Sequence, residues 1–158
     1  MKQHTYRVNI RWTGNIGEGT KTYRGYRRDH VVEAGAKPTL LCSSDPSFLG
    51  DPNRYNPEEL LVASLSGCHM LWYLHLCAVN HVTVAEYSDP ASGVMEETED
   101  GSGAVTRVVL RPAVKVLEAD AIEKARALHA QAHRFCFIAR SVNFPIDILP
   151  KIAAAAQS

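Results

Sequence analysis

Residues 56–68 read NPEELLVASLSGC, and this stretch decides how the chain is organised. Its first four residues suit a helix start: asparagine can cap, proline fits the first helical position, and two glutamates lie at the positive end of the helix dipole. The apolar and small residues that follow continue to about residue 79. The sequence therefore predicts a helix over residues 57–79, with Cys68 near its middle.

Strand-like patterns flank this helix on both sides. Alternating apolar and polar residues, or short apolar runs bounded by turn residues, predict the strands. These are residues 5–13, 20–28, 30–34, 82–88, 93–98, 104–117 and 143–149, with a hairpin turn at 99–103. The first of them, with Tyr6, Val8, Ile10 and Trp12 on one face, is expected to be half-buried.

Two further segments complete the predicted organisation. Residues 35–55 carry several prolines and little periodicity, which predicts a long loop. Loops of this length in a compact domain usually have a function. Asp120, with Glu123 three residues later, forms a capping-box pattern that opens a second helix reaching to about Cys136. Strands, helix, strands, helix and strand in this order predict an α+β fold.

Length and composition narrow the class of protein. A chain of 158 residues with 46% hydrophobic residues suits one soluble domain, here residues 1–158, with 150–158 as a frayed C-terminal tail. Lys plus Arg and Asp plus Glu number 17 each, which argues against a nucleic-acid or anionic-membrane partner. The N-terminus has no apolar run typical of an export signal, so a cytoplasmic location is expected.

The four cysteines are Cys42, Cys68, Cys77 and Cys136. Their wide spacing is unlike a secreted disulfide scaffold, and in a reducing compartment paired cysteines are more often redox-active or metal-binding than structural. Local context favours buried, inert thiols for Cys42 and Cys77. Cys68 alone, mid-helix among apolar residues, also suits an inert thiol and needs a cation or donor from elsewhere to react.

A resemblance to a known family gives the two other cysteines a role. The stretch at 56–68 resembles the first-cysteine helix of the OsmC/Ohr family of hydroperoxide reductases, and residues 133–142 resemble the family's second-cysteine motif, over essentially the whole chain. The resemblance implies an OsmC-like fold of antiparallel sheets with two principal helices in an intertwined homodimer. It also implies that Cys68 attacks an organic hydroperoxide and that Cys136 converts the resulting sulfenic acid into a disulfide. A dithiol reductant, such as a lipoyl group, would then reduce this disulfide.

The activating groups follow the same resemblance. Glu58 matches the family glutamate that holds an activating arginine. The family's hydroperoxide-resistance branch places that arginine after a glycine-rich turn in the N-terminal hairpin, whereas here residues 14–19 read GNIGEG. Arg54, next to the helix start, and Arg24, on the predicted second strand, are the candidates, with Arg27 and Arg28 as further possibilities. No cofactor is expected.

Three alternatives stay open. The missing hairpin arginine favours a non-catalytic dimer that binds a small molecule. A metal site is less favoured, because His129 and His133 share a helix face but no complete metal motif occurs. Aromatic residues near Cys68, such as Trp72 and Tyr73, suit either an apolar pocket for an alkyl hydroperoxide or ordinary core and dimer contacts.

Overall fold

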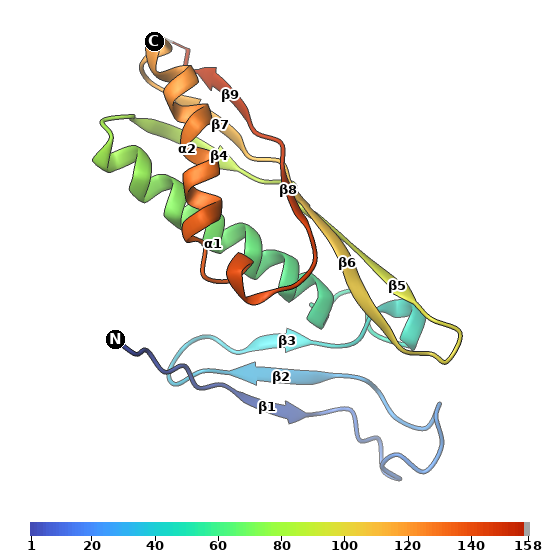
Figure 1. The fold of residues 1–158 in the computed structure, drawn as a ribbon. Coiled ribbons are helices and arrows are strands. Elements are labelled where there is room, and N and C mark those ends of the chain that lie inside the picture. Colours follow the sequence, from blue (N-terminus) through green and yellow to red (C-terminus); the bar gives the residue numbers. More distant parts are fainter. Residues whose placement is uncertain (157–158) are drawn as a thin grey trace. The chain divides into compact units, whose positions relative to one another are not determined.

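The computed structural model describes residues 1–156 and divides the chain into two compact units, residues 1–60 and 61–158. The boundary falls in the first turn of helix α1, Pro57–Val79. Both units contain antiparallel strands, and the two principal helices agree with the predicted α+β class (Figure 1). Each unit is described by itself.

The first unit is a three-stranded sheet. Its order is β1 (Asn9–Trp12), β2 (His30–Glu33) and β3 (Leu40–Cys42), all antiparallel. β1 is shorter than predicted and exposed along its length. The prediction that one face of this strand is buried is therefore wrong for a single copy of the chain. The prediction of one long loop at residues 35–55 is wrong in part, because this segment contains the strand β3 and a 3-10 turn at Pro46–Phe48. Three residues are too few to show a period, and pairing with β2 defines the strand.

The strand predicted at 20–28 does not form; turns and bends take its place. Arg28 explains the compact loop. Its guanidinium donates hydrogen bonds to the carbonyls of Tyr23 and Tyr26, both at 2.7 Å, and lies over both rings. The turn at Gly19 also needs a left-handed backbone conformation, with φ of 58°, which glycine adopts more easily than other residues. β1 therefore pairs with β2 rather than with this segment.

Helix α1 starts as the sequence predicts. The Glu59 amide donates to Asn56 Oδ1 at 2.8 Å, and the Asn56 amide donates to Glu59 Oε2 at 3.1 Å, a reciprocal capping arrangement. The predicted bounds are confirmed. α1 is long and apolar enough to cross a membrane, and 28% of its most apolar 18-residue stretch is buried. Core helices of soluble domains can have the same length and composition.

Two three-stranded sheets form the second unit. One has the order β4 (Val84–Ser88), β7 (Ala113–Val116) and β9 (Lys151–Ala154). The other has the order β5 (Ser92–Glu97), β6 (Gly103–Leu110) and β8 (Ile146–Ile148). The hairpin turn predicted between β5 and β6 is confirmed, as Figure 1 shows.

Two strand predictions need correction here. The segment at 104–117 is two strands of different sheets, β6 and β7, and Pro112, which lacks an amide donor, lies between them. The expected frayed tail is wrong for residues 151–154, which form β9 parallel to β7. Residues 157 and 158 of that tail lie outside the described part of the chain.

Helix α2 (Ile122–Phe135) begins later than predicted. A 3-10 turn at Ala119–Ala121 contains Asp120, and the residue at the cap position, Ala121, makes no side-chain capping bond. The Asp120–Glu123 capping box is therefore wrong. The carboxylate of Glu118 instead accepts from the amide and hydroxyl of Thr83, at 3.1 and 2.6 Å, and ties this turn to the segment after α1.

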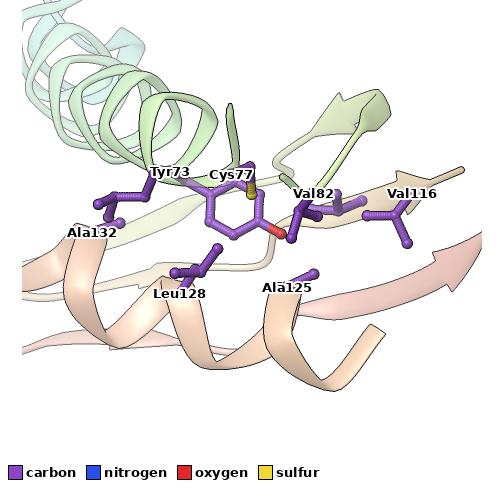
Figure 2. Close-up of a cluster of buried hydrophobic side chains, with 9 residues drawn as sticks. Tyr73, Cys77, Val82, Val116, Ala125, Leu128 and Ala132 are labelled. Carbon is purple, nitrogen blue, oxygen red and sulfur yellow. The ribbon is translucent and has the colours of Figure 1, made fainter. Parts of the chain in front are cut away.

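The main core of the second unit lies between α1, α2 and the β4–β7–β9 sheet. Tyr73 and Cys77 come from α1, Val116 from β7, and Leu128 and Ala132 from α2 (Figure 2). A smaller core joins Leu65 of α1 to Val108 and Leu110 of β6. The smaller core therefore packs on the N-terminal half of α1, and the main core packs on its C-terminal half.

Candidate functional site

Cys68 and Cys136 are neighbours in the second unit. The Cys68 thiol interacts with that of Cys136, and both cysteines are free rather than disulfide-bonded. Their exposure differs: Cys68 is partly accessible, whereas Cys136 is 1% exposed. The fold therefore brings together the two cysteines that the sequence selected, one open to solvent and one beneath the surface.

Cys136 owes its position to the end of α2. It is the C-terminal cap of the helix, in extended conformation, and its amide donates to the Ala132 carbonyl at 2.9 Å. The Ala139 amide in turn donates to Cys136 Sγ at 3.4 Å. Burial, reinforced by Cys68, raises the pKa of Cys136 to about 11, although the Ala139 and Ile138 amides act in the opposite direction. Cys136 is therefore a protonated thiol at neutral pH.

Aromatic residues flank the two cysteines along the chain. Phe135 and Phe137, on either side of Cys136, pack against Trp72, with ring centroids 5.2 and 5.5 Å away. Trp72 lies one helical turn after Cys68 and lines a shallow pocket of about 270 Å³ with Leu71 and His75. Of the two aromatic residues singled out in the sequence, Trp72 thus lines a pocket, whereas Tyr73 belongs to the core.

A buried histidine pair lies beside Cys68 and was not predicted. His69 Nε2 and His129 Nδ1 are 2.9 Å apart, and the residues are only 1% and 3% exposed. His129 also stacks on the Tyr73 ring at 3.8 Å. Burial lowers the pKa of His69 to about 4 and of His129 to about 3. Their spacing of 60 residues gives no sequence signal for the contact.

Acid is expected to destabilise the protein through this pair. Both histidines titrate near 6.5 when unfolded, so below that pH the unfolded chain binds protons that the folded chain does not. The stabilisation is complete above pH 6.5 and is lost as the pH falls towards about 4. Urea unfolding at pH 7 and 4.5 should show a loss of about 5 kcal/mol, from about two pH units for each of the two histidines at about 1.4 kcal/mol per unit.

The matched comparison is the variant His69→Gln/His129→Asn, which keeps neutral hydrogen-bonding groups at the same places but does not titrate in this range. Its loss of stability between the two pH values should be smaller by most of that amount. The exposed His81 serves as the control, and His81→Asn should behave as the wild type. Equal acid sensitivity of wild type and amide variant would contradict the prediction.

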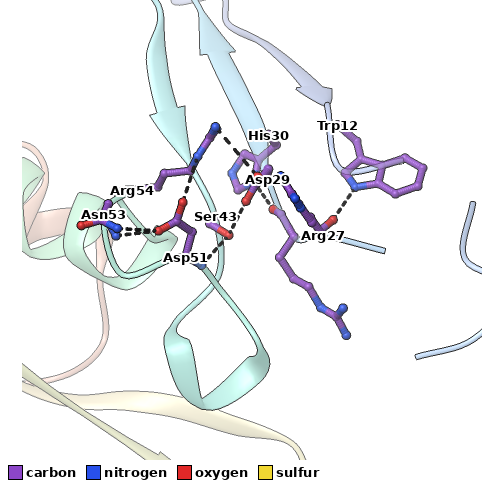
Figure 3. A network of polar contacts seen from close by, with 9 residues as sticks. Trp12, Arg27, Asp29, His30, Ser43, Asp51, Asn53 and Arg54 are labelled. Atoms are coloured by element: carbon purple, nitrogen blue, oxygen red, sulfur yellow. Dashed lines mark hydrogen bonds and ion pairs between the residues drawn. The ribbon is translucent and has the colours of Figure 1, made fainter. Parts of the chain in front are cut away.

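The expected activating groups lie in the first unit. Arg54 is 24% exposed and contacts the carboxylates of Asp29 at 3.8 Å and Asp51 at 3.5 Å (Figure 3). Among residues 1–156, no ion pair within 4.0 Å joins Glu58 to an arginine. Arg24 is exposed in the loop that replaces the predicted second strand. The pairing of Glu58 with an arginine stays a prediction.

The carboxylates around Arg54 are themselves ordered. Ser43, which is fully buried, donates from its hydroxyl to Asp29 at 3.2 Å and accepts from the Asp51 amide at 3.1 Å (Figure 3). The Asn53 amide lowers the pKa of Asp51, with a smaller contribution from the Arg54 charge. Arg54 is thus held by two carboxylates that sequence reasoning did not connect with it.

The two remaining cysteines suit the inert role given to them. Cys42 and Cys77 are buried, and burial raises the pKa of each thiol. The candidate metal ligands do not converge either. Over the described residues, no group of three or more His, Cys, Asp or Glu side chains is arranged to hold a metal ion. A pair such as His69 and His129 alone falls short of a closed zinc site.

Comparison with known proteins places this arrangement in a family. Residues 50–150 match the family model described as OsmC-like protein. This region includes both cysteines, α1 and α2. No curated protein matches the chain.

Solved structures share the fold over nearly the whole chain. An OsmC-like protein of unknown function from Vibrio cholerae is 30% identical, with a TM-score of 0.80, over 96% of this chain and 100% of that one. An organic hydroperoxide resistance protein from Elizabethkingia anophelis is 17% identical, with a TM-score of 0.68, over 98% and 100%. That of Bacillus subtilis is 17% identical, with a TM-score of 0.62, over 95% and 98%. The family match and the Vibrio cholerae relative together show that the chain belongs to the OsmC-like protein family.

Proposed function

We propose that the protein is a thiol-dependent peroxidase that reduces organic hydroperoxides. The observation that carries the proposal is a partly exposed Cys68 beside a buried Cys136 in an OsmC-like chain. A peroxidatic thiol must meet its substrate, and a resolving thiol must lie within reach of the sulfenic acid. The raised pKa of Cys136 keeps its thiol protonated, so it does not compete with Cys68 for the peroxide.

The chemistry balances with one dithiol reductant. The Cys68 thiolate attacks the terminal peroxide oxygen, the O–O bond breaks, and the alkoxide takes a proton to leave as alcohol while Cys68 becomes a sulfenic acid. The Cys136 thiol then attacks the Cys68 sulfur, and the hydroxyl departs as water with the Cys136 proton. A dithiol, such as a lipoyl group, reduces the disulfide and is itself oxidised.

The surroundings of the two thiols suit an organic rather than an inorganic peroxide. Trp72, Phe135 and Phe137 present aromatic surface beside the pair, and Phe137 is largely exposed. Such surface binds an alkyl or aryl group through burial of apolar area but offers little to hydrogen peroxide. The substrate is therefore expected to carry an apolar group.

The proposal includes a cytoplasmic homodimer. Apolar side chains exposed on β1 and β3, such as Ile10 and Leu41, are more than half exposed in the single chain and suit contact with a second copy. The reducing cytoplasm suits a thiol that cycles through a disulfide. Sedimentation of the purified chain tests the dimer directly.

A second function has an observation in its favour. Arg54 is already held by Asp29 and Asp51, and no arginine of the described residues pairs with Glu58. A chain without an activating cation would keep Cys68 slow, and the same apolar surface would then serve a non-catalytic dimer as a small-molecule binding module.

One experiment separates the two functions. The reduced protein is mixed with one equivalent of cumene hydroperoxide, and its disulfides are mapped by mass spectrometry of peptides made without reductant. We expect a Cys68–Cys136 disulfide within seconds and one equivalent of cumyl alcohol. The variant Cys77→Ala, which changes a buried thiol outside the pair, should give the same product. Cumene hydroperoxide that stays intact with reduced Cys68 would favour the binding module.

A further inference from the structure

One buried polar contact joins the two helices that carry the cysteines. It is the hydrogen bond between His69 on α1 and His129 on α2, 2.9 Å long between rings tilted by only 9°. His69 directly follows Cys68, and His129 lies two helical turns before Cys136. Within residues 1–156, no other side-chain hydrogen bond connects α1 with α2.

The hydrogen bond depends on the relative position of the two helices more strictly than apolar packing does. Two neutral imidazoles form one N–H···N bond only when a nitrogen of each ring faces the other, so rotating or sliding either helix breaks it. The outer nitrogens, His69 Nδ1 and His129 Nε2, have no hydrogen-bond partner among residues 1–156. Breaking the bond would leave two more buried polar atoms unsatisfied. The pair therefore fixes the register between α1 and α2, with Tyr73 stacked on it.

We propose that the His69–His129 bond is a positioning device that holds Cys68 and Cys136 in register for disulfide formation, and that protonation of the pair in acid releases this register. The proposal rests on the proposed function, because it concerns the same disulfide. It assigns no chemical step to either histidine; both act through the placement of the two sulfurs, whose Cα atoms must lie within about 7 Å for a bond to form.

The charges around the pair explain why protonation would be disruptive. The facing titratable or charged groups are His133 and Arg126 on α2, Asp89 after β4, Asp147 on β8, Tyr87 on β4, and Tyr73 and Cys77 on α1.

The nearby carboxylates balance a new positive charge only in part: the Asp89 charge favours protonation of His69, but burial and His133 oppose it more strongly. Asp89 already accepts from the Ser66 hydroxyl and the Arg111 amide, both at 2.6 Å. Asp147 is paired with Arg107 at 2.5 Å. The positive Arg126 and, when protonated, His133 add repulsion. A protonated pair thus needs water, and water reaches it only if the helices separate.

The test measures the Cys68–Cys136 disulfide without any peroxide. The full chain is equilibrated in glutathione redox buffers, with a selenol catalyst so that exchange also reaches equilibrium in acid. The variants are His69→Ala, His129→Ala, the amide pair His69→Gln/His129→Asn, and His81→Asn as the control. At pH 7.5 we expect each alanine variant to lower the equilibrium constant about tenfold, and the amide pair and the control to stay within about threefold.

The pH profile distinguishes positioning from a general loss of stability. Glutamine and asparagine place amide groups near the bonding nitrogens and do not titrate, so the amide pair should keep the register in acid. The ratio of the wild-type to the amide-pair equilibrium constant should be near one at pH 7.5 and fall about twofold by pH 4, where about half of the His69 side chains are protonated. If the alanine variants fail to fold, this ratio decides alone.

The outcomes are separable from those of the proposed function. Folded alanine variants with the wild-type equilibrium constant, or a ratio that stays flat to pH 4, would overturn the positioning role and leave the peroxidase proposal intact. A wild type that forms no Cys68–Cys136 disulfide in any redox buffer would overturn the resolving role of Cys136, and the positioning proposal with it.

Discussion

Replacing Cys68 with serine is expected to lower the rate of cumene hydroperoxide consumption by at least about 10³-fold. A serine hydroxyl is scarcely ionised at neutral pH, and its oxygen cannot form the sulfenic acid that stores the oxidising equivalent. The side chain is partly exposed and nearly the same size, so the fold should be preserved. The assay follows hydroperoxide loss with excess dithiol reductant, and circular dichroism verifies the fold.

Cys136→Ser provides the informative contrast. Because Cys136 is expected to act only after the first chemical step, this variant should still consume about one equivalent of hydroperoxide per chain in a first turnover. With excess peroxide and no added thiol, Cys68 should then proceed to sulfinic acid, seen as a gain of two oxygen atoms by mass spectrometry. Cys77→Ala should retain wild-type turnover. Equal peroxide consumption by wild type and Cys68→Ser would refute the peroxidase proposal.

The parts of this site that the sequence predicted are those encoded locally. The start of α1 depends on Asn56 and Glu59, three residues apart, and the structure shows both capping bonds. The pairing of Cys68 with Cys136 required knowledge of a family, because 68 residues separate the two. Their nearness depends on how α1 and α2 pack, which no local pattern encodes.

Errors occurred where tertiary contacts override local preference. Residues 20–28 alternate like a strand, yet Arg28 gathers the carbonyls of Tyr23 and Tyr26 into a loop. Asp120 and Glu123 have the spacing of a capping box, yet α2 starts after Ala121. The contact between His69 and His129 escaped prediction for the same reason. Histidine pairs on separate helices leave no periodic signal, and the pair becomes visible only when the core is assembled.

The arginine is the part of the site for which local pattern was least informative. Arg54 was selected because it precedes the helix start, but Asp29 and Asp51, at 25 and 3 residues away in sequence, hold its guanidinium. Ser43, from a third segment, joins the carboxylate of Asp29 to the backbone amide of Asp51. A network assembled from three separate segments has no signature in the spacing of any one of them.

Tyr73 is expected to give the largest change in stability of any single core position. It is fully buried between α1, α2 and the sheet (Figure 2). Its ring also stacks on His129, with the ring centroids 3.8 Å apart. Tyr73→Ala removes the ring and leaves a cavity, so the free energy of unfolding should fall by about 3–5 kcal/mol. Urea unfolding at pH 7.5, followed by tryptophan fluorescence and circular dichroism, measures the loss.

Tyr73→Phe separates the ring from its hydroxyl. Among residues 1–156 the buried hydroxyl has no oxygen or nitrogen as a hydrogen-bond partner, and burial, with the Cys77 thiol beside it, raises its pKa. Removing it keeps the ring in place and eliminates an unsatisfied polar group, so Tyr73→Phe should match the wild type or be more stable by about 1 kcal/mol. A loss above about 1 kcal/mol would mean that the hydroxyl has a partner, and the neighbouring Cys77 thiol would be the group to replace next. Because the ring also supports His129, Tyr73→Phe should leave the Cys68–Cys136 disulfide equilibrium unchanged, whereas Tyr73→Ala should weaken it.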